Sequence, residues 1–156
     1  MDHMTEIRPA QPADAEGMAE VQNAIYRAGL RANPVDAALV RERYLNVEHK
    51  VACTVAEDEG RVVGFQSLQR AWPGNPYNVS DGWGIIGTHI HPDARRGGLG
   101  RRLFAVSLAA AKDARLRHID ASIGADNSPA LAYYTAMGFT PYQEGGGVIP
   151  HRFDIE

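Results

Sequence analysis

The residues best suited to chemistry lie in one run, GTHIHPDARRGGLGRRL, which covers positions 87–103. Three of its glycines, Gly97, Gly98 and Gly100, would let backbone N–H groups approach a ligand without Cβ atoms in the way. The run also carries four arginines, Arg95, Arg96, Arg101 and Arg102, against one aspartate. Backbone donors combined with guanidinium groups suit a phosphate. We therefore predict an anion site at this turn.

The elements on either side must position the turn. Residues 85–90 suit a strand, and Pro92 ends it because proline cannot donate to the sheet ladder. A helical apolar stripe then follows, made of Leu99, Leu103, Val106 and Ala110. A helix that begins here directs its unpaired N–H groups and its positive dipole end at the turn. The spacings G-x-G-x-x-G and G-x-x-x-x-G-K-[ST] of two other phosphate motifs do not occur at this turn.

Composition narrows the class of protein. The chain has 156 residues, which suits one domain over positions 5–156. Its net charge is −3, so a local basic patch favours a specific polyanionic ligand over bulk nucleic-acid affinity. The single cysteine, Cys53, sits in an apolar run and is expected to be buried and structural. The histidines show no metal-ligand spacing, so we expect no metal. We find no signal-peptide pattern and no apolar run long enough for a membrane, and expect a cytoplasmic protein.

Two motifs carry a resemblance to a known family. The segment 95–100, RRGGLG, resembles the [QR]-x-x-G-x-[GA] signature of the GNAT superfamily of N-acetyltransferases. The segment 127–139, NSPALAYYTAMGF, is similar to that family's N-x-x-A-x-x-x-Y-x-x-x-G-F motif. The opening IRPAQPAD is also similar to the amino-acid and phosphinothricin-type branch. The resemblance implies an enzyme that uses acetyl-CoA as co-substrate, with its pyrophosphate held at the turn.

The predicted elements follow the order β-α-α-β-β-β-α-β-α-β-β. Strands are expected at 5–9, 51–57, 61–68, 85–90, 118–123, 139–142 and 148–155, and helices from Pro12, from Pro34 to Asn46, from Leu99 to about Arg115, and from Ser128 to Gly138, with Ser128 as a cap. This order predicts an α/β or α+β fold with a mixed, mostly antiparallel sheet flanked by helices. The resemblance implies that the central strand and the next one splay apart to admit the pantetheine arm.

The resemblance also assigns roles to residues. It places the pantetheine arm against His89, Ile90 and His91, with a backbone N–H near Ile90 on the thioester carbonyl. The remaining expected contacts with acetyl-CoA are Arg95, Arg96, Gly97, Gly98, Leu99, Gly100, Arg101, Asn127 and Tyr134.

Tyr134 is the expected catalytic residue, because it occupies the family's tyrosine position. A phenol with a pKa near 10 is protonated at neutral pH and can protonate a departing thiolate. The adjacent Tyr133 points about 100° further around the helix and is interpreted as a packing residue.

The general base is left unassigned. Many family members carry a glutamate on the central strand, but positions 83–88 hold no carboxylate. His89, Asp81 and a water chain are the candidates. We expect His89 to face away from the side of Thr88 and Ile90, because side chains alternate along a strand.

The acceptor is expected to be a small-molecule primary amine that attacks directly in a ternary complex. Its pocket would be built from the first two helices, the loop 72–81 and the C-terminal hairpin, where Tyr26, Arg27, Arg31, Trp72, Tyr77 and Arg152 are available. The alternatives are a non-catalytic acyl-CoA-binding module, an N-terminal peptide acetyltransferase and a nucleotide- or nucleic-acid-binding domain. We expect neither a nucleic-acid partner nor a membrane partner. A homodimer would cover exposed sheet edges.

Overall fold

A seven-stranded sheet forms the centre of the structure, a computed structural model that describes residues 5–95 and 97–155. The strands are β1 (Glu6–Pro9), β2 (Lys50–Asp58), β3 (Arg61–Arg70), β4 (Gly84–Ile90), β5 (His118–Gly124), β6 (Thr140–Pro141) and β7 (Val148–Asp154). Their spatial order is β1-β2-β3-β4-β5-β7-β6. Only β4 and β5 run parallel among these described pairs, and the others are antiparallel. The predicted mixed, mostly antiparallel sheet is confirmed.

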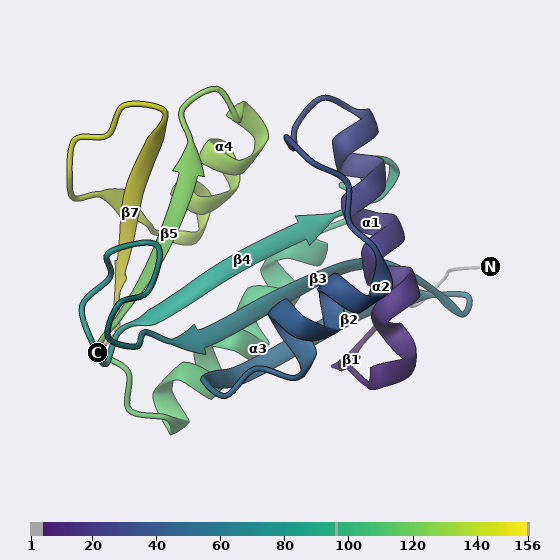
Figure 1. Cartoon of the computed structure of the whole chain (residues 1–156), viewed down its shortest axis with the longest axis horizontal. Coiled ribbons are helices and arrows are strands. Elements are labelled where there is room, and N and C mark those ends of the chain that lie inside the picture. Colours follow the sequence, from purple (N-terminus) through teal and green to yellow (C-terminus); the bar gives the residue numbers. More distant parts are fainter. Residues whose placement is uncertain (1–4, 96, 156) are drawn as a thin grey trace.

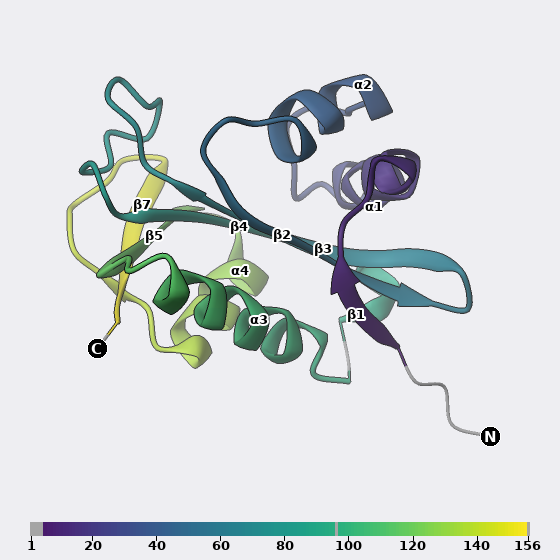
Figure 2. The ribbon, with the colours of Figure 1, turned by 90° about the horizontal axis from the view of Figure 1, so that it is seen from below.

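Helices cover both faces of the sheet (Figure 2). The helices α1 (Ala15–Arg27) and α2 (Ala37–Val40) lie on one face, and α3 (Leu99–Asp113) and α4 (Ser128–Met137) lie on the other. The core on the first face includes Met18, Val21, Val55 and Phe65, which pack between α1 and the sheet. Burying these apolar side chains provides most of the free energy that holds the layers together.

Local capping decides where the helices begin. Asp36 accepts a hydrogen bond from the Leu39 N–H at 2.8 Å, so α2 begins at Ala37 rather than at Pro34. Its continuation, Arg41–Leu45, is a π-helical turn. Asn127, not Ser128, caps α4, because its Oδ1 accepts from the Ala130 N–H at 3.2 Å. Gly138 ends that helix in the left-handed region, at φ 106°, as predicted.

The buried face of α3 differs from the predicted stripe. Leu99 and Leu103 are buried as expected, whereas Val106 is 41% exposed. Phe104 is buried instead and packs against Phe139 and Phe153. Spacings of both three and four residues fit a helix, so tertiary contacts decide which side faces the sheet.

The last two strands are shorter than predicted. The range 139–142 holds only the two residues of β6, because the Phe139 N–H donates to the Tyr134 carbonyl at the end of α4 at 2.9 Å. The final strand ends at Asp154.

The feature that shapes the site is the opening between β4 and β5. These strands pair only at Gly84–Ile119 and Ile85–Asp120, although β4 pairs with β3 as far as Ile90. Beyond Ile85 they diverge, with β5 and β7 turned away from the rest of the sheet (Figure 1). The expected splay is therefore present.

An ion pair fixes the N-terminal strand to α1 and β2. The Arg8 guanidinium donates to both carboxylate oxygens of Asp14 at 2.9 Å and to Glu57 at 3.1 Å. The Gln11 N–H also donates to Asp14. Chiefly because of the hydrogen bonds from Arg8, the pKa of the Asp14 carboxyl is lowered.

We predict that Asp14→Asn lowers the free energy of unfolding at pH 7 by about 1–3 kcal/mol, the range for hydrogen bonds to charged groups. A carboxyl whose pKa is lower in the folded state stabilises the fold above its unfolded pKa of about 3.9, and loses that effect as the pH falls through the folded value. Urea unfolding should therefore separate the variants at pH 7 and bring them together near pH 2. Glu20→Gln, which breaks only an exposed pair with Arg27, is the control. Equal urea midpoints for Asp14→Asn and the wild type at pH 7 would contradict the assignment.

Candidate active site

A cavity of about 460 Å³ follows the opening between β4 and β5. It runs from the start of α3, along β4, to the face of α4. Eight of the predicted acetyl-CoA contacts line it: His89, Ile90, Arg95, Gly98, Gly100, Arg101, Asn127 and Tyr134. Residues more than 40 positions apart in sequence are thus brought to one cavity.

One end of this cavity is suited to an anion. Gly98 is the N-cap of α3 and is left-handed, at φ 75°, which glycine adopts at little cost. The first N–H groups of a helix have no partner within the helix. Arg95 and Arg101 line the same cavity. Together these groups form a positively polarised end, as the glycine and arginine pattern predicted.

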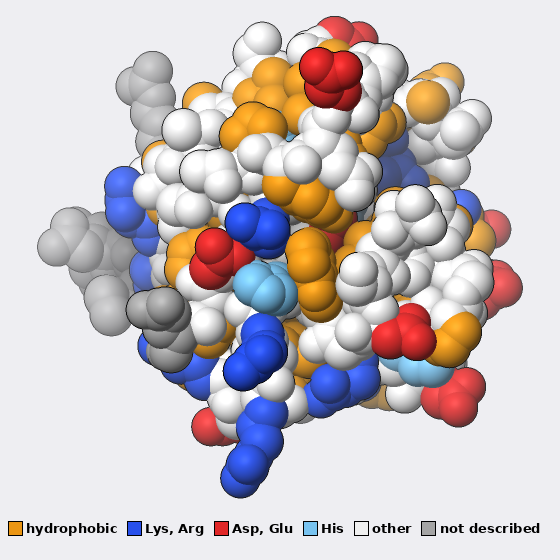
Figure 3. Space-filling model, turned by 90° about the vertical axis from the view of Figure 1, so that its left-hand side faces the viewer, with side chains coloured by type: hydrophobic (Ala, Val, Ile, Leu, Met, Phe, Trp, Pro, Cys, Tyr) orange, Lys and Arg blue, Asp and Glu red, His pale blue; other side chains and the backbone are white. Residues whose placement is uncertain are grey.

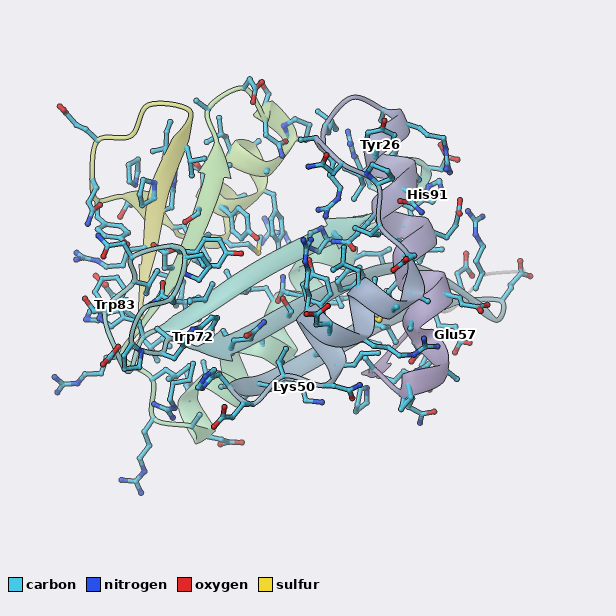
Figure 4. All side chains as sticks on the ribbon, viewed as in Figure 1. Tyr26, Lys50, Glu57, Trp72, Trp83 and His91 are labelled. Atoms are coloured by element: carbon cyan, nitrogen blue, oxygen red, sulfur yellow. The ribbon has the colours of Figure 1, made fainter. Side chains whose placement is uncertain are left out.

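Not every predicted contact lies in the cavity. Leu99 is buried in the core. Arg102, which belongs to the basic patch but was not an expected contact, donates to the Thr5 carbonyl at 2.7 Å. His91 is buried with its Nδ1 accepting from the Asp93 N–H, so it caps a 3-10 turn (Pro92–Ala94); Figure 4 shows it near the end of α1. Gly97, at φ 102°, precedes the cap but does not line the cavity. Arg96 lies outside the described residues.

The hydroxyl groups of Tyr133 and Tyr134 have different hydrogen-bond partners. The Tyr133 O–H donates to the Gly100 carbonyl at 2.8 Å and accepts from Gln66 Nε2 at 3.0 Å. Its proton is therefore committed to a carbonyl. The Tyr134 hydroxyl lies 2.8 Å from Thr88 Oγ1, where either atom can donate. If Thr88 donates, the Tyr134 proton is free to point at a ligand.

Burial keeps the Tyr134 phenol neutral. Its side chain is 5% exposed, and burial raises its pKa well above the usual value of 10. Tyr133 also has a raised pKa, again chiefly because of burial. Tyr133 packs over Gly100, where a Cβ would meet its ring at 2.4 Å, so its predicted packing role is confirmed.

A second cavity, of about 780 Å³, lies on the face of the sheet that α1 and α2 cover. The first cavity also reaches this face, at Ile25, Leu30 and Arg31. The lining of the second cavity includes the aromatic side chains of Tyr44, Trp72 and Tyr77. The His49 ring stacks on the Trp72 ring, with 4.8 Å between the ring centres. The charged lining of the second cavity has both signs: Arg31, Arg43, Glu42 and Glu48. Of the residues predicted for an acceptor pocket, Arg31, Trp72 and Tyr77 are present, whereas Tyr26, Arg27 and Arg152 lie outside it.

The two cavities meet at the centre of the sheet. Gly87 and His89 of β4 and Ser122 of β5 line both of them. Gly87 has no Cβ, and a Cβ there would lie 3.5 Å from His89 Nε2. The two cavities therefore share part of their walls at this junction.

Neither His89 nor Asp81, the two residues considered as a general base, is well suited to that role. The His89 ring packs on Phe65 and near Tyr44, on the face opposite Thr88 as expected, and burial lowers its pKa to about 3. It is thus neutral but weakly basic at neutral pH. Asp81 is exposed and lies outside both cavities. Cys53 is buried as expected, and burial raises the pKa of its thiol to about 12.

Several residues of the site were missed in the sequence. Thr88 and Gln66 hold the tyrosine hydroxyls, and Ser122 stands at the junction. The strand 118–124 alternates polar Asp120 and Ser122 with apolar neighbours. That alternation was a usable signal for a polar face.

Comparison with known proteins places the chain in a family. The model of the acetyltransferase (GNAT) family matches residues 16–139, most of the sequence. The chain belongs to this family.

The chain is similar to several acyltransferases, some of them much longer than itself. It is 25% identical to the L-amino acid N-acyltransferase MnaT of Escherichia coli over 85% of this chain and 78% of that protein. It is 34% identical to the mycothiol acetyltransferase of Amycolatopsis mediterranei over 57% of this chain, but spans only 30% of that protein. A phosphinothricin acetyltransferase from Sinorhizobium meliloti, solved with acetyl-CoA, has a TM-score of 0.78 at 19% identity, covering 97% of this chain and 88% of the other. That likeness supports the fold.

Two kinds of feature are missing from the described residues. None of their helices has the length and apolar character to cross a bilayer. They contain no group of three or more His, Cys, Asp or Glu side chains placed to hold a metal ion.

We predict that Gly98→Ala weakens acetyl-CoA binding by roughly tenfold, because a left-handed alanine costs about 1–2 kcal/mol and the turn must shift to relieve it. Calorimetric titration with acetyl-CoA measures the affinity. Gly146→Ala is a matched control, since that glycine has an ordinary φ and open space around its Cβ position. Unchanged affinity in Gly98→Ala would argue against the turn as the anion site.

Proposed function

We propose that this chain is an acetyl-CoA-dependent N-acetyltransferase that acetylates the primary amine of a small molecule by direct attack in a ternary complex. The observation that carries the proposal is the junction of the two cavities at Gly87, His89 and Ser122. One cavity has an anion-binding end, and the other has a mixed polar and aromatic lining. A donor and an acceptor would meet where they join.

The residues of the first cavity fit acetyl-CoA. Bound there, acetyl-CoA would supply an acetyl group activated as a thioester. The α3 N-terminus, Arg95 and Arg101 would hold the pyrophosphate. The unpaired edge of β4 near Ile90 would hold the pantetheine arm and offer an N–H to the thioester carbonyl, and Asn127 would contact the same arm. A positioned backbone donor of this kind contributes about 3 kcal/mol to lowering a barrier in other enzymes.

Tyr134 would protonate the departing thiolate. Its phenol is neutral at neutral pH, more firmly so because burial raises its pKa, and Tyr134 lines the first cavity. Tyr133 is a poor substitute, since its proton is held by the Gly100 carbonyl.

The second cavity supports a small acceptor that carries charge besides its amine. Arg31 and Arg43 would bind a carboxylate or phosphate, and Glu42 and Glu48 would attract an ammonium group. The aromatic side chains add faces on which a cation or an apolar group packs.

The proposal is tested by measuring free thiol released from acetyl-CoA with a panel of amines. The panel holds free amino acids, phosphinothricin-like analogues, polyamines, aminoglycosides and peptides with free N-termini. We expect saturable release with one class of small amine. Saturable release with peptides alone would indicate an N-terminal peptide acetyltransferase. Binding of acetyl-CoA without release for any acceptor would indicate an acyl-CoA-binding module.

We predict that Tyr134→Phe lowers kcat by about 100-fold, the lower end for loss of a general acid, and leaves the Kd of acetyl-CoA nearly unchanged. Because the pKa of Tyr134 is raised, the wild-type rate should not fall through loss of this proton up to pH 10. Stopped-flow thiol detection across pH 6–10 measures both effects.

Tyr133→Phe is the matched control for that experiment. It removes the hydrogen bond to the Gly100 carbonyl and should weaken acetyl-CoA binding more than it lowers kcat. Equal turnover by Tyr134→Phe and the wild type would exclude the assigned role.

A further inference from the structure

The proposed mechanism does not use Asp120, a buried carboxylate of the sheet. Asp120 lies on β5 at the last residue that pairs with β4, and its exposed fraction is 1%. The Tyr142 hydroxyl donates to its Oδ2, and the Ser122 hydroxyl donates to its Oδ1 at 3.1 Å. Each carboxylate oxygen therefore has a hydroxyl partner, as a buried charge requires.

Ser122 connects this carboxylate to the junction of the cavities. It lies two residues further along β5, on the same face as Asp120, and lines both cavities. A serine hydroxyl has one proton and two acceptor lone pairs. Because its proton is directed at Asp120, its lone pairs are available to accept an N–H from a group at the junction.

We propose that Ser122 and Asp120 form the proton relay that removes the proton from the acceptor amine, in place of the carboxylate that is missing from the central strand. This inference rests on the proposed function and deepens it. Ser122 is the residue that would touch the amine, and Asp120 acts through it.

The relay accounts for every bond and proton that changes in the acetyl transfer. As the amine nitrogen forms its bond to the acetyl carbon, the carbon–sulfur bond breaks. The nitrogen's proton moves to Ser122 Oγ while the Ser122 proton moves to Asp120 Oδ1, and the sulfur takes the Tyr134 proton. One proton is gained at Asp120 and one is lost at Tyr134, so exchange with water restores both groups.

The surroundings of Asp120 suit a proton acceptor. Burial raises its pKa, while the hydrogen bonds from Tyr142 and Ser122 and the charge of His151 oppose that effect. Arg152 of β7 lies opposite Asp120 in register, and Tyr134 of α4 also interacts with it electrostatically. A carboxylate with a raised pKa accepts a proton more readily than one at the ordinary value near 3.9.

Tyr142 lies between Asp120, to which its hydroxyl donates, and the surface of the molecule. Its half-buried ring lies 5.5 Å from Trp83, and the Arg152 guanidinium is 5.8 Å from its centre. The face drawn in Figure 3 brings acidic, basic, histidine and apolar side chains close together. Trp83 lies near the start of β4, at the end of the molecule where Trp72 is also found (Figure 4).

A purely structural role for Asp120, holding Tyr142 in place, makes a different prediction. In that case Ser122→Ala would leave the rate unchanged, because the bond between Asp120 and Tyr142 survives. The relay predicts that the same substitution disconnects the amine from its acceptor.

The test uses Ser122→Ala, Ser122→Thr and Asp120→Asn in the full chain, with the amine that the wild type accepts best. We expect Ser122→Ala and Asp120→Asn each to lower kcat by about 100-fold with an unchanged Kd for acetyl-CoA. Ser122→Thr keeps the hydroxyl and should keep most of the rate. Ser107→Ala is the matched control, since that serine is buried in α3, outside both cavities.

The basicity of the acceptor gives a readout that a structural role would not move. The loss in the two variants should shrink for an amine of lower pKa, such as an amino-acid amide compared with the free amino acid, because less help is needed to remove its proton. A loss that is the same for both amines would overturn the relay.

A titration of aspartate ¹³C-carboxyl signals by NMR provides a readout without turnover. Asp120→Asn identifies the Asp120 signal, which should titrate above the ordinary pKa. Ser122→Ala should raise that pKa further, because a hydrogen bond to the charged form has been lost. An Asp120 signal that Ser122→Ala does not change would contradict the contact on which the relay depends.

The outcomes separate the two proposals. If the wild type releases thiol and the Ser122→Ala and Asp120→Asn variants do so at the same rate, the relay is wrong and the proposed function stands. If the wild type releases no thiol with any amine of the panel, both are overturned.

Discussion

The site depends on the early separation of β4 from β5. The two strands share only the pairs at Gly84 and Ile85, and β3 holds β4 straight for the rest of its length. The backbone of β4 beyond Ile85 therefore has no strand partner on the β5 side. Buried N–H and C=O groups need partners. An extended ligand that carries amide groups, as pantetheine does, would provide them and take the place of a missing strand pairing.

The two helices on one face turn that opening into a directional site. The helix α3 begins at its mouth with a left-handed glycine, and α4 covers its floor with two adjacent tyrosines. Adjacent positions on a helix face different directions, so the tyrosines acquire different partners. Tyr133 ties α4 to the first turn of α3 through the Gly100 carbonyl, while Tyr134 contacts Thr88 on β4. The Tyr133 hydroxyl holds the turn in place, and the Tyr134 hydroxyl is the one that we propose as the proton donor.

The sequence predicted the parts of this arrangement that have short-range causes. The glycines of the turn, the alternation of the strands and the spacing of the 127–139 motif are local, and the structure places them in strands, turn and helix as expected. The predicted start of α2 and the predicted N-cap of α4 were wrong, because Asp36 and Asn127 provide the caps instead of the residues expected. The exposure of Val106 was missed because packing of Phe104 against Phe139 and Phe153 rotates the buried face of α3.

The long-range part of the site was harder to predict. Asp120 and Ser122 lie on a strand whose polar face is visible in the sequence, but nothing local says that Tyr142 would reach Asp120 or that β5 would border both cavities. His89 was a reasonable candidate base from its ordinary pKa, and its packing on Phe65 removed that basicity. Distant side chains meeting across the sheet therefore decide which group can accept a proton.

A crystal structure of the chain with acetyl-CoA tests the central claim most directly. Our account predicts the pyrophosphate against the first N–H groups of α3, with Arg95 and Arg101 beside it, and the pantetheine arm between β4 and β5. The thioester should lie at the junction near Gly87, within reach of the Tyr134 hydroxyl. Acetyl-CoA bound away from the β4–β5 opening, or an opening closed by strand pairing, would contradict the account.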